Sequence, residues 1–565
     1  MIEDRIKKLR DNFDKYKIDG YVVPKNDEFF SEYSEINRIK IISNFSGSAG
    51  IAIILKKKNY LFVDGRYTLQ AKIESGKNFI LVSYDKIINC NLFKNLTLGI
   101  DSKLLTSTQV KNYFSKYNKI KIIDNNLIDK IKISPLKRNK PFYSLSNKIV
   151  GQSHFSKLTK IATYLQKKKA DYIFISAPEN VAWMLNIRGH DNPNSPIPNC
   201  RLIISKTKKF YLITDHYKTK ILIKKKKINP NHVIRPKNFQ NLILNLKNKK
   251  FIIDKKTCSL FYEQLIKSKF EIVDDEDPTY LLKALKNKKE INNMIKSHII
   301  DGVALTKFLY WIKNINKKQI SEVDAQNKLE KFRKKNKEYL FPSFQTIAGT
   351  GPNGAIVHYR AKKNSCRIIN KSDIFLCDSG GQYKYGTTDV TRTICFSKQK
   401  NNVKNIFTKV LKGHIAVANT NLTKINTGKK IDIRARKFLK MSGLDYAHGT
   451  GHGVGFFLNV HEGPQSISKV NNIKILEGMI LSNEPGYYKE RSFGMRIENL
   501  VYVKKRNNNL CFENLTLAPI DKDLINYKLL TNIEKNYLFK YHLNIYSRLS
   551  KYLTTNEKKW LASHF

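Results

Sequence analysis

The chain has 565 residues, and its 103 Lys and Arg against 47 Asp and Glu give a formal net charge of +56. At about 100–200 residues per domain this length suggests about three domains, and 41% hydrophobic with 27% charged residues is typical of a globular protein. No apolar run approaches the roughly 18 residues of a membrane-spanning helix, and the N-terminus shows no apolar signal segment, so we expect neither a membrane protein nor an exported one.

The first two blocks of the chain have the same kind of pattern. In the first, residues 1–148, a charged amphipathic start precedes the expected strands YVVP, IAIIL and YLFVDGRY, and ISPLKRNKPFYSLSNK closes the block as a linker. The second, residues 149–280, opens with an expected helix over 155–169, followed by the strands DYIFISA, RLIIS, FYLITD and KFIIDKK. A helix followed by strands in both blocks indicates a duplicated α/β unit, although the residues do not repeat closely.

The third block, residues 281–565, has a different character. Apolar residues recur near helical spacing from Ile291 to Ile312 and predict a long amphipathic helix, and the segment Ser321-Glu-Val-Asp324 resembles a capping box that begins a second one. Glycines are then frequent among the expected strands IFLCDSGG, VTRTICF, GMILSNEP and GMRIENLVYV, before a C-terminal helix with apolar residues four apart. We expect the chemistry in this Gly-rich block.

The positive charge does not by itself indicate a nucleic-acid-binding protein. Lys far outnumbers Arg, which is the residue that bidentate recognition of bases and phosphates prefers. The lysines are spread over the whole chain beside abundant Asn and Ile, as an A+T-rich coding sequence would produce. A solvated lysine-rich surface is the preferred interpretation, and a surface for acidic peptides or an anionic membrane stays an alternative without a localised patch.

The seven cysteines never form a CxxC pair, so a disulfide framework or a thiolate zinc site is not expected. They are expected to be reduced thiols in a cytoplasmic protein.

Two aspartates stand out in a chain that is poor in acidic residues. Asp378 ends the apolar run IFLCD, and Asp389 follows eleven positions later. With QYKYG as a turn between them, the two would lie close together on neighbouring antiparallel strands. Two adjacent carboxylates repel, so one would stay protonated unless a cation lay between them. On their own, however, the two aspartates fit a turn-capping role better.

Three histidines, His448, His452 and His461, fall within fourteen positions of HGTGHGVGFFLNVH. The four glycines between 449 and 455 disfavour a helix, so the imidazoles are expected on extended or looped backbone. A single histidine is usually structural, but three beside glycines that allow close approach are more typical of a site.

Two glutamates complete the set. Glu484 ends an apolar strand, and Glu498 is expected inside another, on the same face as Arg496 two residues earlier, so an ion pair between those two is an alternative explanation. Four carboxylates and one histidine would form a hard, oxygen-rich site that suits two bridged divalent ions, manganese or a similar metal. A single structural zinc would need mainly Cys or His ligands.

The motifs DSGGQYKYGTTDVTRT, HGTGHGVG, SNEPGYY and GMRIEN resemble those that carry the five metal ligands of the "pita-bread" metallopeptidases. This superfamily includes Xaa-Pro aminopeptidase, prolidase, methionine aminopeptidase and creatinase. The three-domain cytosolic Xaa-Pro aminopeptidases match better, because GPNGAIVHYR, VHEGP, VAWMLNIRG and the N-terminal FSGSAG and DGRYTLQA also resemble theirs. The resemblance implies an α/β (α+β) fold with two creatinase-like domains, 1–148 and 149–280, before a pita-bread catalytic domain with a C-terminal extension, 281–565.

The resemblance also implies the ligand set. Asp389 and Glu498 would bridge the two metal ions, Asp378 would hold one ion, and His452 with Glu484 would hold the other.

Further roles follow from the same resemblance. Glu484 would be the base for the attacking water, and His461 would stabilise the oxyanion. His358 and His448 would contact the substrate and assist proton transfer. Arg66 of DGRY would contact substrate from the first domain, although it could simply pair with Asp64.

We therefore expect a cytoplasmic aminopeptidase that uses two divalent metal ions, with manganese as the expected metal, to cleave peptides with proline in second position. The C-terminal helix resembles the dimerising segment of the family, so a homodimer is expected, without nucleic acid or membrane as partner. One alternative is a prolidase restricted to Xaa-Pro dipeptides, and another is a catalytically silent pita-bread binding protein.

Overall fold

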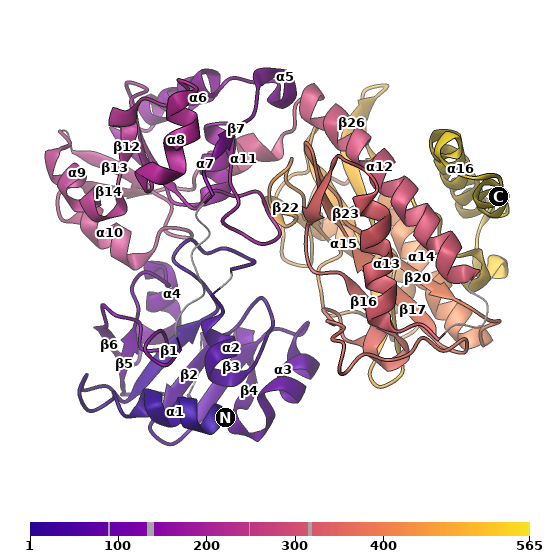
Figure 1. The fold of residues 1–565 in the computed structure, drawn as a ribbon, viewed down its shortest axis with the longest axis horizontal. Coiled ribbons are helices and arrows are strands. Elements are labelled where there is room, and N and C mark those ends of the chain that lie inside the picture. The colour runs from indigo at the N-terminus through magenta and orange to yellow at the C-terminus, as the bar shows by residue number, and fades with distance from the viewer. Residues whose placement is uncertain (35, 89–90, 133–139, 248, 315–318) are drawn as a thin grey trace. The chain divides into compact units, whose positions relative to one another are not determined.

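The computed structural model describes residues 1–565 except 35, 89–90, 133–139, 248 and 315–318 (Figure 1). The chain divides into two compact units, Met1–Thr279 and Tyr280–Phe565. The six cysteines that the structure describes are free thiols, as expected, and Cys90 lies outside the described residues. Among the described helices, none combines the length and the apolar character needed to cross a bilayer.

The first unit contains two six-stranded sheets with the same topology, drawn in indigo and in magenta in Figure 1. The order is β4-β3-β2-β1-β5-β6 in one and β12-β11-β10-β8-β13-β14 in the other. In the first sheet β2 runs antiparallel to both of its neighbours, β3 and β1, and in the second sheet β10 runs antiparallel to β11 and β8. The remaining strand pairs of both sheets are parallel. The duplicated α/β unit that the sequence indicated is therefore present at the level of strand order and direction.

The expected strands of this unit form where the chain is most apolar, because strands covered on both faces need side chains that tolerate burial throughout. All five residues of β1 are buried, as are the first four of β2. The bounds of the first sheet are β1 Gly20–Pro24, β2 Ile51–Leu55, β3 Asn59–Val63, β4 Ile80–Ser83, β5 Thr97–Ile100 and β6 Lys119–Ile122. Those of the second are β8 Tyr172–Ile175, β10 Arg201–Ser205, β11 Phe210–Ile213, β12 Val233–Ile234, β13 Lys250–Ile253 and β14 Glu271–Asp274.

Helices of the first unit begin at polar caps. The helix expected over 155–169 is α6, His154–Lys167, and the Ser153 hydroxyl accepts a hydrogen bond from the Ser156 amide at its start. The other long helices of the unit are α1 Ile2–Arg10, α3 Thr68–Ser75, α8 His216–Lys224 and α10 Leu260–Lys267.

The second unit is built around two small antiparallel sheets that carry the Gly-rich motifs. One has the order β16-β17-β20 and the other β22-β21-β23-β26-β27, and the hairpin β24-β25 lies in the chain between β23 and β26 of the second sheet. Their bounds are β16 Ile347–Thr350, β17 Ile374–Ser379, β20 Val390–Cys395, β21 Gly451–Gly453, β22 Glu462–Ile467, β23 Ile480–Asn483, β24 Gly486–Lys489, β25 Phe493–Arg496, β26 Asn499–Arg506 and β27 Asn509–Asn514.

Helices of the second unit confirm three predictions. The long amphipathic helix is α12, Lys288–Lys313, and the C-terminal one is α16, Asn532–Leu549. The predicted capping box begins α13, Glu322–Lys334: the Asp324 amide donates to the Ser321 hydroxyl, and the Ser321 amide donates to the Asp324 carboxylate. The remaining helices are α14 Asn401–Ala418, α15 Gly428–Lys440 and α17 Thr555–Ala562.

A buried ion pair joins α12 to α13 beneath the first of these sheets. Arg333 Nε lies 2.7 Å from Asp301 Oδ1, its Nη2 donates to the Ser379 hydroxyl, and the Tyr383 hydroxyl donates to the same Asp301 oxygen. All four side chains are buried. Because a buried charge without its partner is costly, this pair fixes α13 against α12.

We expect Arg333→Leu to lower the free energy of unfolding of the second unit by about 3–5 kcal/mol, because Asp301 would stay buried and unpaired. Urea denaturation followed by the fluorescence of Trp311 and Trp560 measures the change. The matched control is Lys334→Leu, since Lys334 pairs with Glu330 at the exposed surface and such pairs contribute less than about 1 kcal/mol. Equal effects of the two substitutions would contradict the structural importance of the buried pair.

Candidate dinuclear metal centre

Strand ends bring the predicted ligands together. Asp378 lies in β17 opposite Thr391 of the antiparallel strand β20, and Asp389 precedes β20 by one residue. The two aspartates are therefore close together on neighbouring antiparallel segments, Asp378 within its strand and Asp389 directly before the other. The intervening QYKYG segment forms the short hairpin of β18, Gly381–Tyr383, and β19, Gly386–Thr387. His452 lies in β21 on extended backbone, and Glu484 directly follows β23.

The expectation of one continuous strand through GMRIENLVYV is wrong. β25 ends at Arg496, β26 begins at Asn499, and Glu498 lies in the break between them. The break arises because the chain changes partners: Arg496 pairs with Gly486 in the β24-β25 hairpin, whereas Asn499 pairs with Asn483 of β23. This change of partner also removes the basis for expecting Arg496 and Glu498 on the same strand face.

The five side chains form one cluster. Ligand atoms of Asp378, Asp389 and Glu498 lie within 4.8 Å of one another, and so do those of His452, Glu484 and Glu498. Glu498 belongs to both groups, so the two groups are contiguous. His452 Nε2 lies 3.4 Å from Asp389 Oδ2 and 3.5 Å from Glu484 Oε1. The donors are carboxylate oxygens and one imidazole nitrogen, which is a set suited to hard divalent cations.

The electrostatics of the cluster fit bound cations. Burial, followed by repulsion from Asp389 and Glu484, raises the pKa of Asp378 to about 7. Burial and the same kind of repulsion raise the pKa of Glu498 well above its usual range. Oδ1 of Asp378 is buried and accepts no hydrogen bond within the described chain. Buried carboxylates that repel one another and leave an oxygen unpaired are what a site for divalent cations requires.

The pKa values of His452 and Glu484 shift in opposite directions. Burial acts to lower the pKa of His452, but Asp389 and Glu484 outweigh it and raise the pKa to about 9. For Glu484, burial acts to raise the pKa, but His452, His448 and Arg496 lower it overall. Glu484 is therefore the carboxylate of this side that holds its negative charge most readily.

Arg496 connects the cluster to a histidine that lies outside it. Its guanidinium donates to Asp378 Oδ2 at 2.6 Å and to the Thr391 hydroxyl at 3.0 Å, and it also binds the Tyr488 hydroxyl. The Tyr488 oxygen lies 2.9 Å from Nε2 of His448. The alternative ion pair of Arg496 with Glu498 is thus replaced by a pair with Asp378. The sequence indicates this network through an arginine inside an apolar strand, but the strand pattern points to the wrong carboxylate, Glu498, as its partner.

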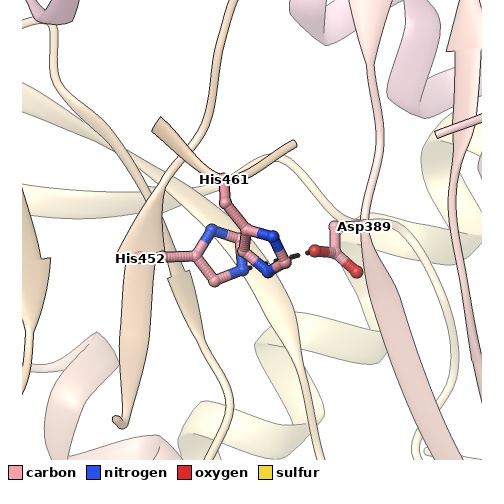
Figure 2. A group of neighbouring side chains, drawn as sticks. All are labelled: Asp389, His452 and His461. Carbon is pink, nitrogen blue, oxygen red and sulfur yellow. Dashed lines mark ion pairs between the residues drawn. The ribbon is translucent and has the colours of Figure 1, made fainter. Parts of the chain in front are cut away.

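The two remaining histidines of the Gly-rich block differ in their surroundings. His448 is buried, with Nδ1 at 2.7 Å from the Gly449 carbonyl oxygen, and burial lowers its pKa to about 4, so the ring is neutral near pH 7. His461 is exposed and lies just before β22, with its ring centroid 4.1 Å from that of His452. Figure 2 shows the two rings beside each other, with Asp389 facing His452.

His358 and Arg66 lie on segments that carry none of the five candidate ligands. His358 is half-buried in the loop that follows the short 3-10 turn Gly351–Ala355. That turn meets β25 closely, because a Cβ added to Gly494 would lie 1.8 Å from the Gly354 carbonyl oxygen. Arg66 lies in the first unit, where its guanidinium donates two hydrogen bonds to Asp64, as the alternative reading expected. Their roles toward substrate stay predictions.

Family models match the chain in four segments. Residues 292–505 match metallopeptidase family M24, and 508–564 match the C-terminal region of that family. Residues 5–131 and 133–290 each match a creatinase/prolidase N-terminal domain.

The chain is similar to known proteins and structures over almost its whole length. It is 37% identical to a probable Xaa-Pro aminopeptidase P of Laccaria bicolor, covering 99% of this chain and 92% of that protein, and 35% identical to one of Coprinopsis cinerea, covering 98% and 96%. The X-prolyl aminopeptidase of Caenorhabditis elegans, described as a cytosolic enzyme with a di-nuclear active site, matches with a TM-score of 0.93, 27% identity and coverage of 100% and 99%.

A prolidase of Pyrococcus furiosus matches less of the fold, with a TM-score of 0.51, 25% identity and coverage of 63% of this chain and 98% of that one. The matches confirm the predicted fold class of creatinase-like domains before a pita-bread domain. The chain belongs to the Xaa-Pro aminopeptidase P family of the M24 metallopeptidases.

Proposed function

We propose that the protein is a metal-dependent aminopeptidase that releases the N-terminal residue from peptides with proline in second position. The observation that carries the proposal is the convergence of four carboxylates and one histidine, in a chain similar from end to end to proteins named Xaa-Pro aminopeptidase P. The alternative of a catalytically silent binding protein is disfavoured, because all five candidate ligands are present and converge.

The ligand assignment is part of the proposal. Asp389 and Glu498 would bridge two divalent cations, Asp378 would hold one, and His452 with Glu484 would hold the other. The overlap of the two groups at Glu498 supports its bridging role. Manganese is the proposed metal, because mainly oxygen ligands suit hard divalent ions. When bound, a pair of such cations would supply a hydroxide near neutral pH and polarise the scissile carbonyl.

The remaining roles concern protons and charge. Glu484, whose lowered pKa keeps it ionised, would accept the proton of the attacking water. His461, exposed beside His452, would donate a hydrogen bond to the oxyanion. His448 and His358 would contact the substrate on the proline side, where a donor is needed to protonate the departing nitrogen.

Proline sets a particular chemical demand. A Xaa-Pro bond is a tertiary amide without an N–H group, and the residue before proline is conformationally restricted. A peptidase that binds that N–H or requires an extended chain therefore fails on it, whereas a site with histidine donors near the bond does not depend on it. Arg66 would add a contact to the substrate from the first domain.

Domain limits and cellular location are also proposed. The limits 1–148, 149–280 and 281–565 would separate two creatinase-like domains from the catalytic domain, which is supported by one six-stranded sheet in each of the first two. A cytoplasmic location is supported by the similarity to an enzyme described as cytosolic, and cell fractionation tests it.

With manganese bound, we expect the protein to remove the first residue of a Xaa-Pro-Pro tripeptide, as measured by chromatography of the products. Cleavage confined to a Xaa-Pro dipeptide would show a prolidase instead. Glu484→Gln should lower kcat/KM by at least about a hundredfold, because Glu484 is proposed both as a metal ligand and as the general base. Glu490→Gln, at an exposed position six residues away, should leave kcat/KM unchanged and so exclude a contaminating peptidase.

The affinity of the metal-free protein for Mn²⁺ should rise with pH. Asp378, with a pKa of about 7, and His452, with a pKa of about 9, must lose protons to bind a cation. Each proton released adds up to about tenfold in affinity per pH unit below the pKa concerned. Isothermal titration calorimetry in buffers of different ionisation enthalpy measures the affinity and the protons together. An affinity that stays constant or falls between about pH 6 and pH 8 would contradict the assignment.

A homodimer through the C-terminal helix is the proposed assembly. Ile533, Phe539 and Leu543 of α16 are exposed by 74%, 48% and 44%, so the helix presents apolar side chains on the side that does not pack on the core, which supports a partner there. Leu543→Glu should convert a species of twice the chain mass into a monomer in sedimentation equilibrium. A wild-type protein that sediments as a monomer at micromolar concentration would contradict the dimer.

A further inference from the structure

A buried glutamate outside the metal cluster binds one loop at several points. Glu322 is the first residue of α13 and is fully buried. Its Oε1 accepts from the Thr350 amide at 2.8 Å and from the Asn353 side chain at 3.1 Å. Its Oε2 accepts from the Tyr359 hydroxyl at 2.7 Å and from the Arg367 amide at 2.9 Å. Both oxygens of one carboxylate are thus used by a single segment, residues 350–367.

This segment is the loop that carries His358. Thr350 lies at its beginning, Tyr359 next to His358, and Arg367 at its end, so the carboxylate ties together three places far apart in the loop. The backbone adds to the connection, because the Glu322 amide donates to the Arg367 carbonyl oxygen at 3.0 Å. The loop begins at β16, whose Ile347 pairs with Asp378, so its start is registered on the strand that carries a candidate metal ligand.

The Glu322 side chain is not needed to cap its own helix. Ser321 and Asp324 already satisfy the start of α13 through the reciprocal capping box. Between the 3-10 turn Gly351–Ala355 and Arg367 the loop contains no helix or strand that would fix its course. Glu322 instead accepts from both ends of the segment, the Thr350 and Arg367 amides, and from its middle, the Tyr359 hydroxyl. Burial and the Glu322 carboxylate raise the pKa of Tyr359, so its hydroxyl keeps its proton and donates.

We propose that Glu322 is a positioning residue that fixes the loop 350–367 so that the His358 imidazole is held in place for the substrate. The proposal rests on the proposed aminopeptidase function and on the substrate role of His358. A histidine that must approach a reacting bond loses much of its effect when it is displaced by about 1 Å, so a rigid loop is a requirement for its action.

The test is Glu322→Gln, which keeps the size of the side chain but turns one acceptor into an NH₂ donor that faces the loop donors. We expect kcat to fall by at least about tenfold while the bound manganese per chain changes little. The melting temperature of the second unit should fall, because a buried donor loses its acceptor, but the protein should stay folded at the assay temperature. The matched control is Asp324→Asn on the same helix, with the same change of charge but no contact with the loop, and it should retain wild-type kcat. Tyr359→Phe removes one donor and should give a smaller loss than Glu322→Gln.

Hydrogen exchange gives a readout that does not depend on activity. Peptides from residues 350–367 should exchange faster in Glu322→Gln than in the wild type, whereas peptides that contain the candidate metal ligands should not change. Wild-type exchange in the loop, or wild-type kcat in a correctly folded Glu322→Gln protein, would overturn the proposal.

A double-mutant cycle tests the connection to His358. In a His358→Gln background, adding Glu322→Gln should cause no further loss of kcat, because the histidine that it positions is already absent. Independent, multiplicative losses would overturn the proposal, as would a His358→Gln enzyme with wild-type kcat. If the wild-type protein cleaves no Xaa-Pro peptide, the proposed function fails, and the exchange measurement still decides whether Glu322 holds the loop.

Discussion

Mutual repulsion among four neighbouring carboxylates, three of them buried and Glu484 half-buried, is the constraint on which the catalytic unit depends. Asp378, Asp389, Glu484 and Glu498 are held close together, although burial alone makes a single carboxylate costly. A chain with few acidic residues places four of them together because bound cations can offset the repulsion. The raised pKa values of Asp378 and Glu498 show how strongly the cluster holds protons when no cation is bound.

Arginines that are buried with the cluster hold its backbone and side chains in place. Arg496 neutralises one side of Asp378, and its other donors bind neighbouring hydroxyls. Arg392 acts on the backbone: it is fully buried, donates to the Glu498 carbonyl oxygen at 2.7 Å, and also binds the Ala518 carbonyl oxygen and the Tyr541 hydroxyl. The C-terminal helix α16 is thereby attached to the backbone of a candidate bridging ligand.

The histidines proposed to contact the substrate on the proline side are also held, directly or through their loop, by hydrogen bonds from neighbouring residues. His448 is oriented by Gly449 and Tyr488, and the loop of His358 is gathered by Glu322. In each case a hydrogen-bonding partner limits the movement of a side chain that is proposed to contact the substrate. The lysine-rich exterior takes no part in this organisation, and the net charge of +56 gives no indication of where the chemistry lies.

The strands were predictable from the sequence, because short apolar runs such as IAIIL between turn residues are typical of buried sheet. The four carboxylates were predictable as well, because carboxylates in or beside such runs are costly without a function, whereas it was the resemblance to the pita-bread metallopeptidases that indicated His452 among three histidines. The sequence also indicated the capping box at Ser321. It did not determine the partner of Arg496 or the break before Asn499, because strand pairing between distant segments decides both. Only the tertiary structure revealed that Glu322, which the sequence places simply in the first turn of a helix, collects donors from a loop up to 45 residues away. Such a role depends on long-range contacts that local sequence patterns do not encode.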